Sequence, residues 1–395
     1  MELLLNHADE KTILNNLNNH PSKKSPQLLL CFSHLRWDFV YQRPQHLLSR
    51  FSSDYTVMFF EEPIFDTPGD PSLSFSLRAD NLWVVVPHLP SATPGDKSNA
   101  IIKRLLDNLL NSHDLGSYIF WYYTPMALSF SSHFKPSFIV YDCMDELSNF
   151  KFAPPELRTN EEELFSRADI VFTGGHSLYE AKKNKHKNIY PFPSSIDKSH
   201  FEQARQIDEE PQDQQNIPHP RLGFYGVIDE RFDIELISKM ATQKPDWNFV
   251  LLGPVVKIDP ASLPVLPNVH FLGGKSYNEL PAYLSGWDIA LIPFLLNEAT
   301  RYISPTKTPE YLSAGVPVIS TPIHDVVSPY GDEGLVKIAK NDTEFLEAAE
   351  ELLSMDVATF LPVADAFLSK QSWTLTFEKM KERITQTLHS NTILN

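Results

Sequence analysis

Two series of short apolar segments, separated by one polar stretch, constrain the fold of this 395-residue chain more than any other feature. In each series, apolar runs of five or six residues alternate with longer amphipathic stretches, such as 97–112, 155–167 and 176–185. This alternation is typical of parallel sheets that helices cover on both faces. The predicted strands are 28–32, 55–60, 82–86, 118–122, 137–141, 169–173 and 188–192 in the first series, and 221–226, 248–253, 268–273, 288–293, 316–320 and 335–339 in the second.

The polar stretch between the two series divides the chain. Residues 202–220 are acidic, rich in Gln and poor in large apolar residues, which is the composition of a linker. We therefore predict an N-terminal domain at 26–201 and a C-terminal domain at 221–371, both doubly wound α/β domains, facing each other across a cleft. Residues 1–25 are expected to form a polar arm, and 372–395 a terminal helix that packs back on the N-terminal domain. Ligands of such sheets bind outside the carboxyl ends of the strands.

Composition excludes some partners. The net charge of −16 argues against nucleic acid, because binding phosphate backbones requires clustered Lys and Arg. Cys31 and Cys143, the two cysteines, lie in apolar runs and indicate a reducing compartment. The N-terminal apolar run at 3–5 is too short for a signal peptide, so we expect a cytoplasmic protein. Lysines at 182–187 leave peripheral contact with the inner face of the membrane open.

The pattern that points most directly to a ligand lies within residues 287–322. A polar loop there leads into a predicted helix that carries Ser304 and Thr306 at its start, with Lys307 next. Free N–H groups, the helix dipole and a lysine together favour phosphate. Glu310 lies one turn further on, where its carboxylate could accept hydrogen bonds from both hydroxyls of a ribose. The alternative is a capped surface helix with a Lys/Glu pair.

The loop after the first predicted strand is bulky and basic, and we consider it a candidate acceptor site. Trp37 could provide a stacking platform for an acceptor sugar, or it could pack on the core. The candidate residues of this loop are Arg36, Trp37, Asp38 and Arg43.

Two aspartates after another strand, Asp142 and Asp145, are also placed on the acceptor side. Either could accept a hydrogen bond from an acceptor hydroxyl, although Asp142 could instead cap its own loop. Their spacing, with two residues between them, differs from a D-x-D metal pair. No His or Cys spacing typical of zinc is present, so we predict no metal.

The segment PEYLSAGVPVIST, residues 309–321, resembles the second half of the C-terminal E-x7-E signature of a large family. This is the retaining GT-B glycosyltransferase family, which includes sucrose-phosphate synthases and many bacterial polysaccharide transferases. The resemblance implies that Glu310 holds the ribose of a nucleotide-sugar donor. Tyr302 stands where the family has its first Glu, which contacts the donor sugar.

The start of the second series is also similar to this family, whose first C-domain strand ends in Gly and is followed by an Arg and a Lys that bind the donor diphosphate. Here Gly226 ends the strand, Val227 replaces the Arg, and Arg231 lies near the position of the Lys. Arg231 and Lys307 together would neutralise a diphosphate and stabilise it as leaving group. Gly253 and Gly273 end the next two strands, where glycine lets the backbone approach a nucleotide base or simply forms a turn.

Residues 27–330 as a whole resemble a bacterial subgroup of teichuronic-acid-type and other surface-polysaccharide transferases. Segments 34–47, 141–150 and 172–182 carry this similarity, and 188–201 resembles the family's interdomain segment.

The resemblance implies a GT-B fold and transfer of a sugar, with retention, from a UDP-, GDP- or dTDP-sugar to a glycan or lipid-linked acceptor. The process would be cell-surface polysaccharide synthesis, without a metal or another cofactor. The expected catalytic residues are Asp145, Arg231 and Lys307. The alternatives are an inactive homologue or sugar-nucleotide-binding scaffold, a GT-B-shaped sugar-nucleotide epimerase, and a two-domain sugar-binding protein.

Overall fold

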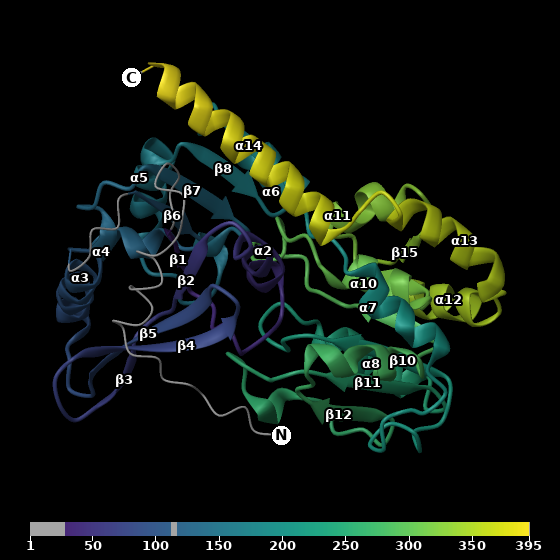
Figure 1. The fold of residues 1–395 in the computed structure, drawn as a ribbon. Helices are drawn as coiled ribbons and strands as arrows, with labels where there is room; N and C mark the ends of the chain where they lie inside the picture. Colours follow the sequence, from purple (N-terminus) through teal and green to yellow (C-terminus); the bar gives the residue numbers. More distant parts are fainter. Residues whose placement is uncertain (1–27, 112–116, 395) are drawn as a thin grey trace.

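The computed structural model describes residues 28–111 and 117–394, so the predicted polar arm lies outside the described residues. Two sheets, each with its own helices, lie side by side and form two lobes (Figure 1). The first sheet has the strand order β3-β5-β2-β1-β6-β7-β8-β9. Strand β4 lies off this path and pairs with β5. Its strands are β1 Leu28–Phe32, β2 Thr56–Phe60, β3 Ile64–Thr67, β4 Ser72–Ala79, β5 Leu82–Pro90, β6 Tyr118–Tyr122, β7 Phe138–Cys143, β8 Ile170–Thr173 and β9 Ile189–Pro191.

The second sheet has the order β12-β11-β10-β13-β14-β15, and all its strand pairs are parallel. Its strands are β10 Arg221–Tyr225, β11 Asn248–Leu252, β12 Val269–Gly273, β13 Ile289–Ile292, β14 Val318–Ser320 and β15 Val336–Ile338. The α-helices are α2 Arg43–Phe51, α3 Gly95–Asn111, α4 Leu128–Ser131, α5 Leu157–Arg167, α6 His176–Lys182, α7 Lys198–Phe201, α8 Ile234–Gln243, α9 Leu280–Leu284, α10 Lys307–Ala314, α11 His324–Val326, α12 Asp342–Leu353, α13 Val357–Leu368 and α14 Trp373–Leu394.

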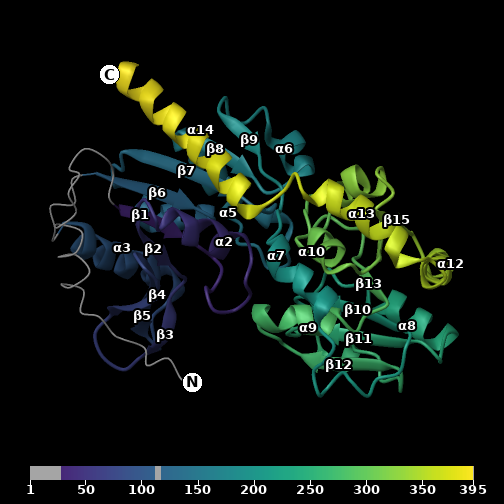
Figure 2. The ribbon, with the colours of Figure 1, turned by 45° about the vertical axis from the view of Figure 1, so that its right-hand side comes forward.

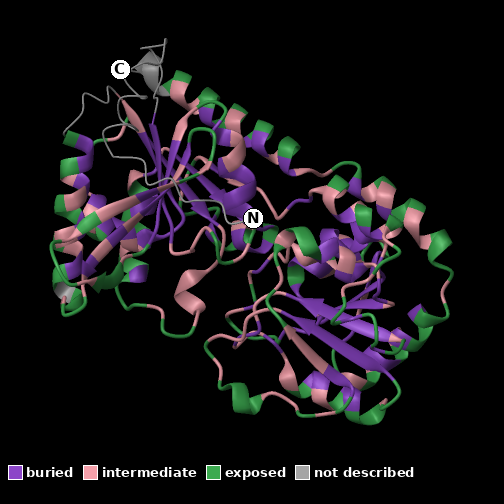
Figure 3. Cartoon of the chain, turned by 60° about the horizontal axis from the view of Figure 1, so that its bottom comes forward, coloured by how far each residue is buried: buried purple, intermediate pink, exposed green. Residues whose placement is uncertain are grey.

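The central strands are buried on both faces because helices cover both sides of each sheet (Figure 3). Successive residues of β1 point to opposite faces, so Leu28 and Leu30 join one apolar core, and Leu29 and Cys31 join another. Burial on both faces explains why these strands are continuous apolar runs in the sequence.

The sequence does not predict β3 and β4, and β4 departs from the parallel pattern by pairing antiparallel to β5. In β4 only Phe75 is buried, because this edge strand covers the core with one face alone. Its serine-rich sequence therefore lacks the apolar run that marks the other strands.

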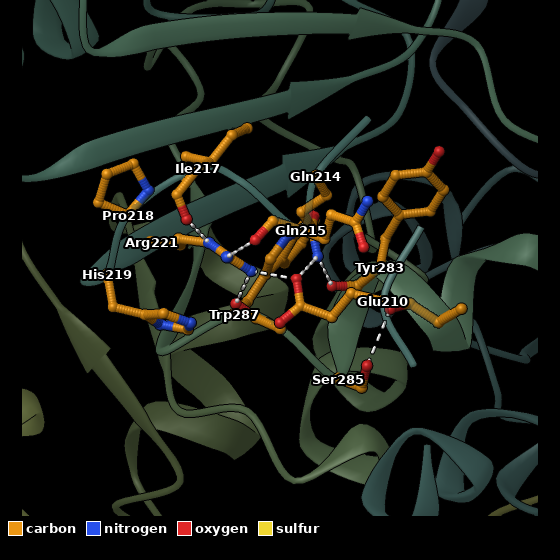
Figure 4. A network of polar contacts seen from close by, with 12 residues as sticks. Glu210, Gln214, Gln215, Ile217, Pro218, His219, Arg221, Tyr283, Ser285 and Trp287 are labelled. Atoms are coloured by element: carbon orange, nitrogen blue, oxygen red, sulfur yellow. Dashed lines mark hydrogen bonds and ion pairs between the residues drawn. The ribbon is translucent and has the colours of Figure 1, made fainter. Parts of the chain in front are cut away.

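The stretch 202–220 is fastened to the second lobe by buried polar groups (Figure 4). The Arg221 side chain forms an ion pair with Glu210, and its Nε donates to the Ile217 carbonyl at 2.6 Å. The fully buried Gln214 accepts a hydrogen bond from Trp287 Nε1 at 2.9 Å. A polar composition therefore accompanies an ordered connection here, because its side chains satisfy buried donors and acceptors.

The terminal helix α14 leaves the second lobe and lies along the first (Figures 1 and 2). Trp373, Phe377, Met380 and Ile384 belong to the apolar core that includes Leu29 and Cys31. The rings of Phe377 and Phe51 are 4.9 Å apart. Helix α14 thus connects the lobes a second time.

Among the described residues, no single helix has the length and apolar character to cross a membrane, and one bent pair, α12 with residues 357–390, passes that test by length and composition alone.

We predict that Trp373→Ala lowers the free energy of unfolding by about 3–5 kcal/mol, because the indole is fully buried where α14 meets the first lobe. Urea unfolding followed by circular dichroism measures this change. Leu375→Ala, on the same helix but 39% exposed, is the matched control and should change stability by less than about 1 kcal/mol. Equal effects of the two substitutions would contradict the packing of α14 described here.

Candidate functional site

A cavity of about 110 Å³ lies between the two lobes, where the carboxyl ends of the central strands meet. Met144 and Asp145 follow β7, Gly174 follows β8, and Phe294 follows β13. The lining residues come from both lobes and are Gln42, Arg43, Met144, Asp145, Gly174, Ser194, Val227, Arg231, Phe294, Ile303, Ser304, Pro305, Thr306 and Lys307. The structure thus brings together five of the predicted site residues: Arg43, Asp145, Arg231, Thr306 and Lys307.

Lys307 is the first residue of α10, and its side chain faces the cavity. Its Nζ lies 5.6 Å and 5.8 Å from the ring centroids of Phe224 and Phe294, and within the described residues no carboxylate oxygen lies within ion-pair distance of it. Burial and, after it, the charge of Arg231 lower the pKa of Lys307 to about 8, while the charges of Glu310 and Asp229 raise it. An anion bound in the cavity would therefore provide the negative charge that Lys307 lacks.

The start of α10 strengthens the attraction for an anion. Thr306 is the N-cap residue, and its side chain makes no capping hydrogen bond. Ser304 and Pro305 also line the cavity, so the positive end of the helix dipole faces it. The sequence places this helix start near Ser304 and Pro305, close to where the structure has it.

Gly226 makes the position of the Lys307 side chain possible. Its φ is +138°, and a Cβ on it would lie 2.4 Å from Lys307 Cε. Gly253, with φ +142°, packs directly on the Gly226 carbonyl. Both glycines thus have a packing role in this structure, and contact with a nucleotide base stays a prediction for Gly253 and for Gly273, whose φ is +74°.

Arg231 lines the cavity while it pairs with its own loop. Its Nε and Nη2 donate to the two carboxylate oxygens of Asp229, at 2.9 Å and 2.7 Å. A plain surface ion pair with a neighbouring acid would be the alternative role for Arg231, and the acid that it contacts here is Asp229. The guanidinium also lies 5.5 Å from the Phe150 ring of the first lobe, so Arg231 bridges the cleft.

Asp145 faces the cavity from the first lobe. Burial raises the pKa of its carboxyl to about 6, although Arg231 and Arg43 lower it. Asp145 is the one carboxylate among the described cavity-lining residues.

Asp142 lies outside the cavity, in contrast to its predicted place beside an acceptor. It is fully buried, and Arg43 Nη2 and Nε donate to its two oxygens at 2.8 Å and 3.0 Å. Arg43 Nη1 also donates to the Phe192 carbonyl at 2.7 Å. A buried carboxylate needs such a partner. Because both oxygens of Asp142 bind Arg43, they are not directed at a ligand.

The other loop candidates also lie outside the cavity. The Trp37 ring is partly buried and packs on Phe59 of the core, with centroids 5.0 Å apart, away from the cavity lining. Arg36 pairs with Glu61 at 2.9 Å. Asp38 pairs with Arg78 at 2.6 Å on the surface. The side chains of Arg36 and Asp38 thus form ion pairs within the first lobe and do not line the cavity.

Glu310 is buried behind the cavity, on α10. It accepts a hydrogen bond from the Tyr225 hydroxyl, and burial raises its pKa. The predicted contact with a ribose stays a prediction. Sequence reasoning missed Tyr225, whose only signal is its position as the last residue of β10.

Among the described residues, no group of three or more His, Cys, Asp and Glu side chains could hold a metal ion.

We predict that Asp145→Asn stabilises the protein more at high pH than at low pH. Because its pKa is raised, the Asp145 carboxyl binds its proton more tightly in the folded state than in the unfolded state. Protonation of Asp145 therefore contributes to the free energy of unfolding below about pH 4, and this contribution is lost as the pH rises through about 6. Asparagine does not titrate, so the advantage of the variant over the unsubstituted protein should grow by about 3 kcal/mol between pH 4 and pH 7.5. Urea unfolding at both pH values measures the change.

Asp142→Asn serves as the contrast. It breaks the buried pair with Arg43 and should destabilise by about 3–5 kcal/mol near neutral pH. An effect of Asp145→Asn that is the same at both pH values would contradict the raised pKa.

Comparisons with known proteins bear on the fold and the class of activity. Residues 220–355 match the model of a family described as Glycosyl transferases group 1. A curated relative is the putative teichuronic acid biosynthesis glycosyltransferase TuaH of Bacillus subtilis (strain 168). It is 25% identical over 282 residues, which cover 66% of this chain and 70% of the relative.

Two solved structures share the fold over most of this chain. Sucrose-phosphate synthase from Thermosynechococcus elongatus has a TM-score of 0.67 at 14% identity, covering 92% of this chain and 100% of that one. Anabaena HepE, solved with UDP and glucose, has a TM-score of 0.63 at 14% identity, covering 91% and 100%. The chain has an α/β GT-B fold, and the family match together with the curated relative supports a glycosyltransferase.

Proposed function

We propose that this protein transfers a sugar from a UDP-, GDP- or dTDP-sugar to a glycan or lipid-linked acceptor in cytoplasmic steps of cell-surface polysaccharide synthesis. The observation that carries the proposal is the Lys307 ammonium, which faces the interlobe cavity at the start of α10 and has no carboxylate partner in the described parts of the chain. The name of the curated relative, a putative teichuronic acid biosynthesis glycosyltransferase, supports glycosyl transfer in polysaccharide synthesis.

The donor diphosphate would lie against the start of α10. There it meets the Lys307 ammonium, the helix dipole and the guanidinium of Arg231. These groups stabilise the negative charge that develops as the sugar leaves, so they favour the transition state over the bound donor. Because Asp229 already holds Arg231 in place, the guanidinium is oriented before the donor arrives.

The ribose would lie near Glu310. The Tyr225 hydroxyl now donates to this carboxylate, so a ribose hydroxyl would replace or share that hydrogen bond. The raised pKa of Glu310 reflects burial, and hydroxyl donors from a ribose would favour its charged form.

Asp145 would contact the reacting sugar or the acceptor hydroxyl from the opposite wall. In a retaining transfer, an oxygen of the departing phosphate can take the acceptor proton on the same face, so Asp145 would orient the hydroxyl by accepting its hydrogen bond. With a pKa of about 6 it is mostly ionised above neutral pH and suited to accept.

The cavity favours a transferase over an epimerase. Acid and base catalysis on the donor sugar would need paired carboxylates, and Asp145 is the one carboxylate among the described lining residues. Tyr302, at the position of the family's first Glu, packs instead against the apolar core of the first lobe, beneath Arg301. An inactive homologue would bind the nucleotide without turnover, so binding and turnover must both be measured.

Isothermal calorimetry with UDP, GDP, dTDP and NAD tests the donor site. We expect one nucleoside diphosphate to bind selectively at micromolar concentration, and Lys307→Ala to weaken it by about 10–100-fold, because a charge-assisted contact is lost. Glu310→Ala should also weaken binding, by removing the ribose contact. Lys340→Ala, an exposed lysine of the same lobe, is the matched control and should leave the affinity unchanged. A folded protein that binds none of these diphosphates would overturn the proposal.

The stereochemistry is tested separately, with the sugar nucleotide of the base that calorimetry selects. We expect the new glycosidic bond to have the same anomeric configuration as the donor, read from proton coupling constants of the product by NMR. An inverted product would contradict retention while leaving glycosyl transfer intact. Donor binding with no transfer to any glycan or lipid-linked acceptor would favour the inactive scaffold.

A further inference from the structure

One buried carboxylate of the second lobe binds the backbone of the first. Asp325 in α11 is 4% exposed, and its two oxygens accept hydrogen bonds from successive amides of α6. His176 N donates to Oδ2 at 2.8 Å, and Ser177 N donates to Oδ1 at 2.9 Å. We refer to this pair of hydrogen bonds as the Asp325 contact.

The contact fits closely against the cavity wall. A Cβ on Gly175 would lie 2.2 Å from Asp325 Oδ2 and 3.0 Å from the Cβ of Ser304. Gly174, the preceding residue, and Ser304 both line the cavity. Ser194 Oγ also donates to the Ser304 carbonyl across the cleft, at 2.7 Å. The Asp325 contact therefore adjoins the loop that leads into α10 and its Lys307.

The two backbone donors to the Asp325 carboxylate belong to the other lobe. Within its own lobe, the ring of His324 lies 3.2 Å away and is 64% exposed, and Tyr330 is a further ionisable neighbour. Hydrogen bonds from backbone N–H groups to a carboxylate are stronger than those between neutral groups. Closing the lobes thus replaces water around this carboxylate with two fixed donors, and opening them returns it to water.

A separation of the lobes would break the Asp325 contact and open the cavity to water. Closure after a donor binds would exclude water from the reacting atoms.

We propose that Asp325 is a positioning residue, whose contact with His176 and Ser177 holds the two lobes closed and so completes the cavity around Lys307. The statement about closure stands on the contacts alone. Only the identity of the enclosed ligand rests on the proposed function.

Hydrogen exchange on the ligand-free full-length chain tests the contact directly. Asp325→Ala should raise the exchange rates of the His176 and Ser177 amides by about tenfold or more, because their acceptor is lost and the lobes open to water. Asp325→Asn keeps one acceptor oxygen and should give an intermediate increase. Asp332→Ala, an exposed acid after α11, is the matched control and should change neither amide. Protection of both amides that is unchanged in Asp325→Ala would overturn the proposal.

Turnover separates positioning from a merely structural role. With the diphosphate selected by calorimetry, we expect Asp325→Ala to change the affinity by less than about threefold, because Lys307 and Arg231 both belong to the second lobe. Transfer by the same variant should fall at least about tenfold, and Asp325→Asn should recover part of it. Equal losses of affinity and turnover, with a lowered melting temperature, would overturn the positioning role. If the unsubstituted protein binds no diphosphate, the proposed function fails while the exchange experiment still decides the contact.

Discussion

A buried ammonium group, for which residues 28–111 and 117–394 provide no carboxylate partner, is the constraint around which the cleft is organised. Lys307 lies between the rings of Phe224 and Phe294, where burial and Arg231 disfavour its charge. Water-poor surroundings make a lone cation costly, and they also strengthen its attraction for an anion. The start of α10 adds a dipole of the same sign. An anionic ligand would relieve this unfavourable arrangement, and this is the physical reason for our proposal that the site binds a diphosphate.

The two arginines that line the cleft are compensated within the protein, whereas no carboxylate among the described residues forms an ion pair with Lys307. Arg43 is neutralised by Asp142, and Arg231 by Asp229. These pairs fix the walls of the cavity, and the space for the lysine comes from a backbone without a side chain at Gly226. The Asp325 contact then joins the two walls. Binding of an anion, orientation of the guanidinium and closure of the lobes are thus parts of one arrangement.

Sequence patterns predicted the parts of this arrangement that repeat along the chain. The parallel strands are apolar on both faces, so their positions follow from composition. The helix start with Lys307 was also visible in the sequence, whereas Arg231 was singled out by the family resemblance; both line the cavity together with Asp145. The edge strand β4 was missed because it buries one face only. The sequence revealed less about which side chains pair with one another. Nothing local in the sequence distinguishes Asp142, which binds Arg43 from a distant helix, from Asp145, which faces the cavity. Tyr225 and Asp325 were missed for the same reason, since their partners are far away in the chain.

The pKa of the Lys307 amino group tests the central claim most directly. NMR of lysine side chains, with Lys307→Ala to identify the signal, measures this pKa in the free protein and in the presence of UDP, GDP or dTDP. The account predicts a value below that of an ordinary lysine in the free protein, near 8, and a rise when the bound diphosphate supplies the missing negative charge. An ordinary value that no diphosphate changes would show that Lys307 is not the anion-binding group of the cleft.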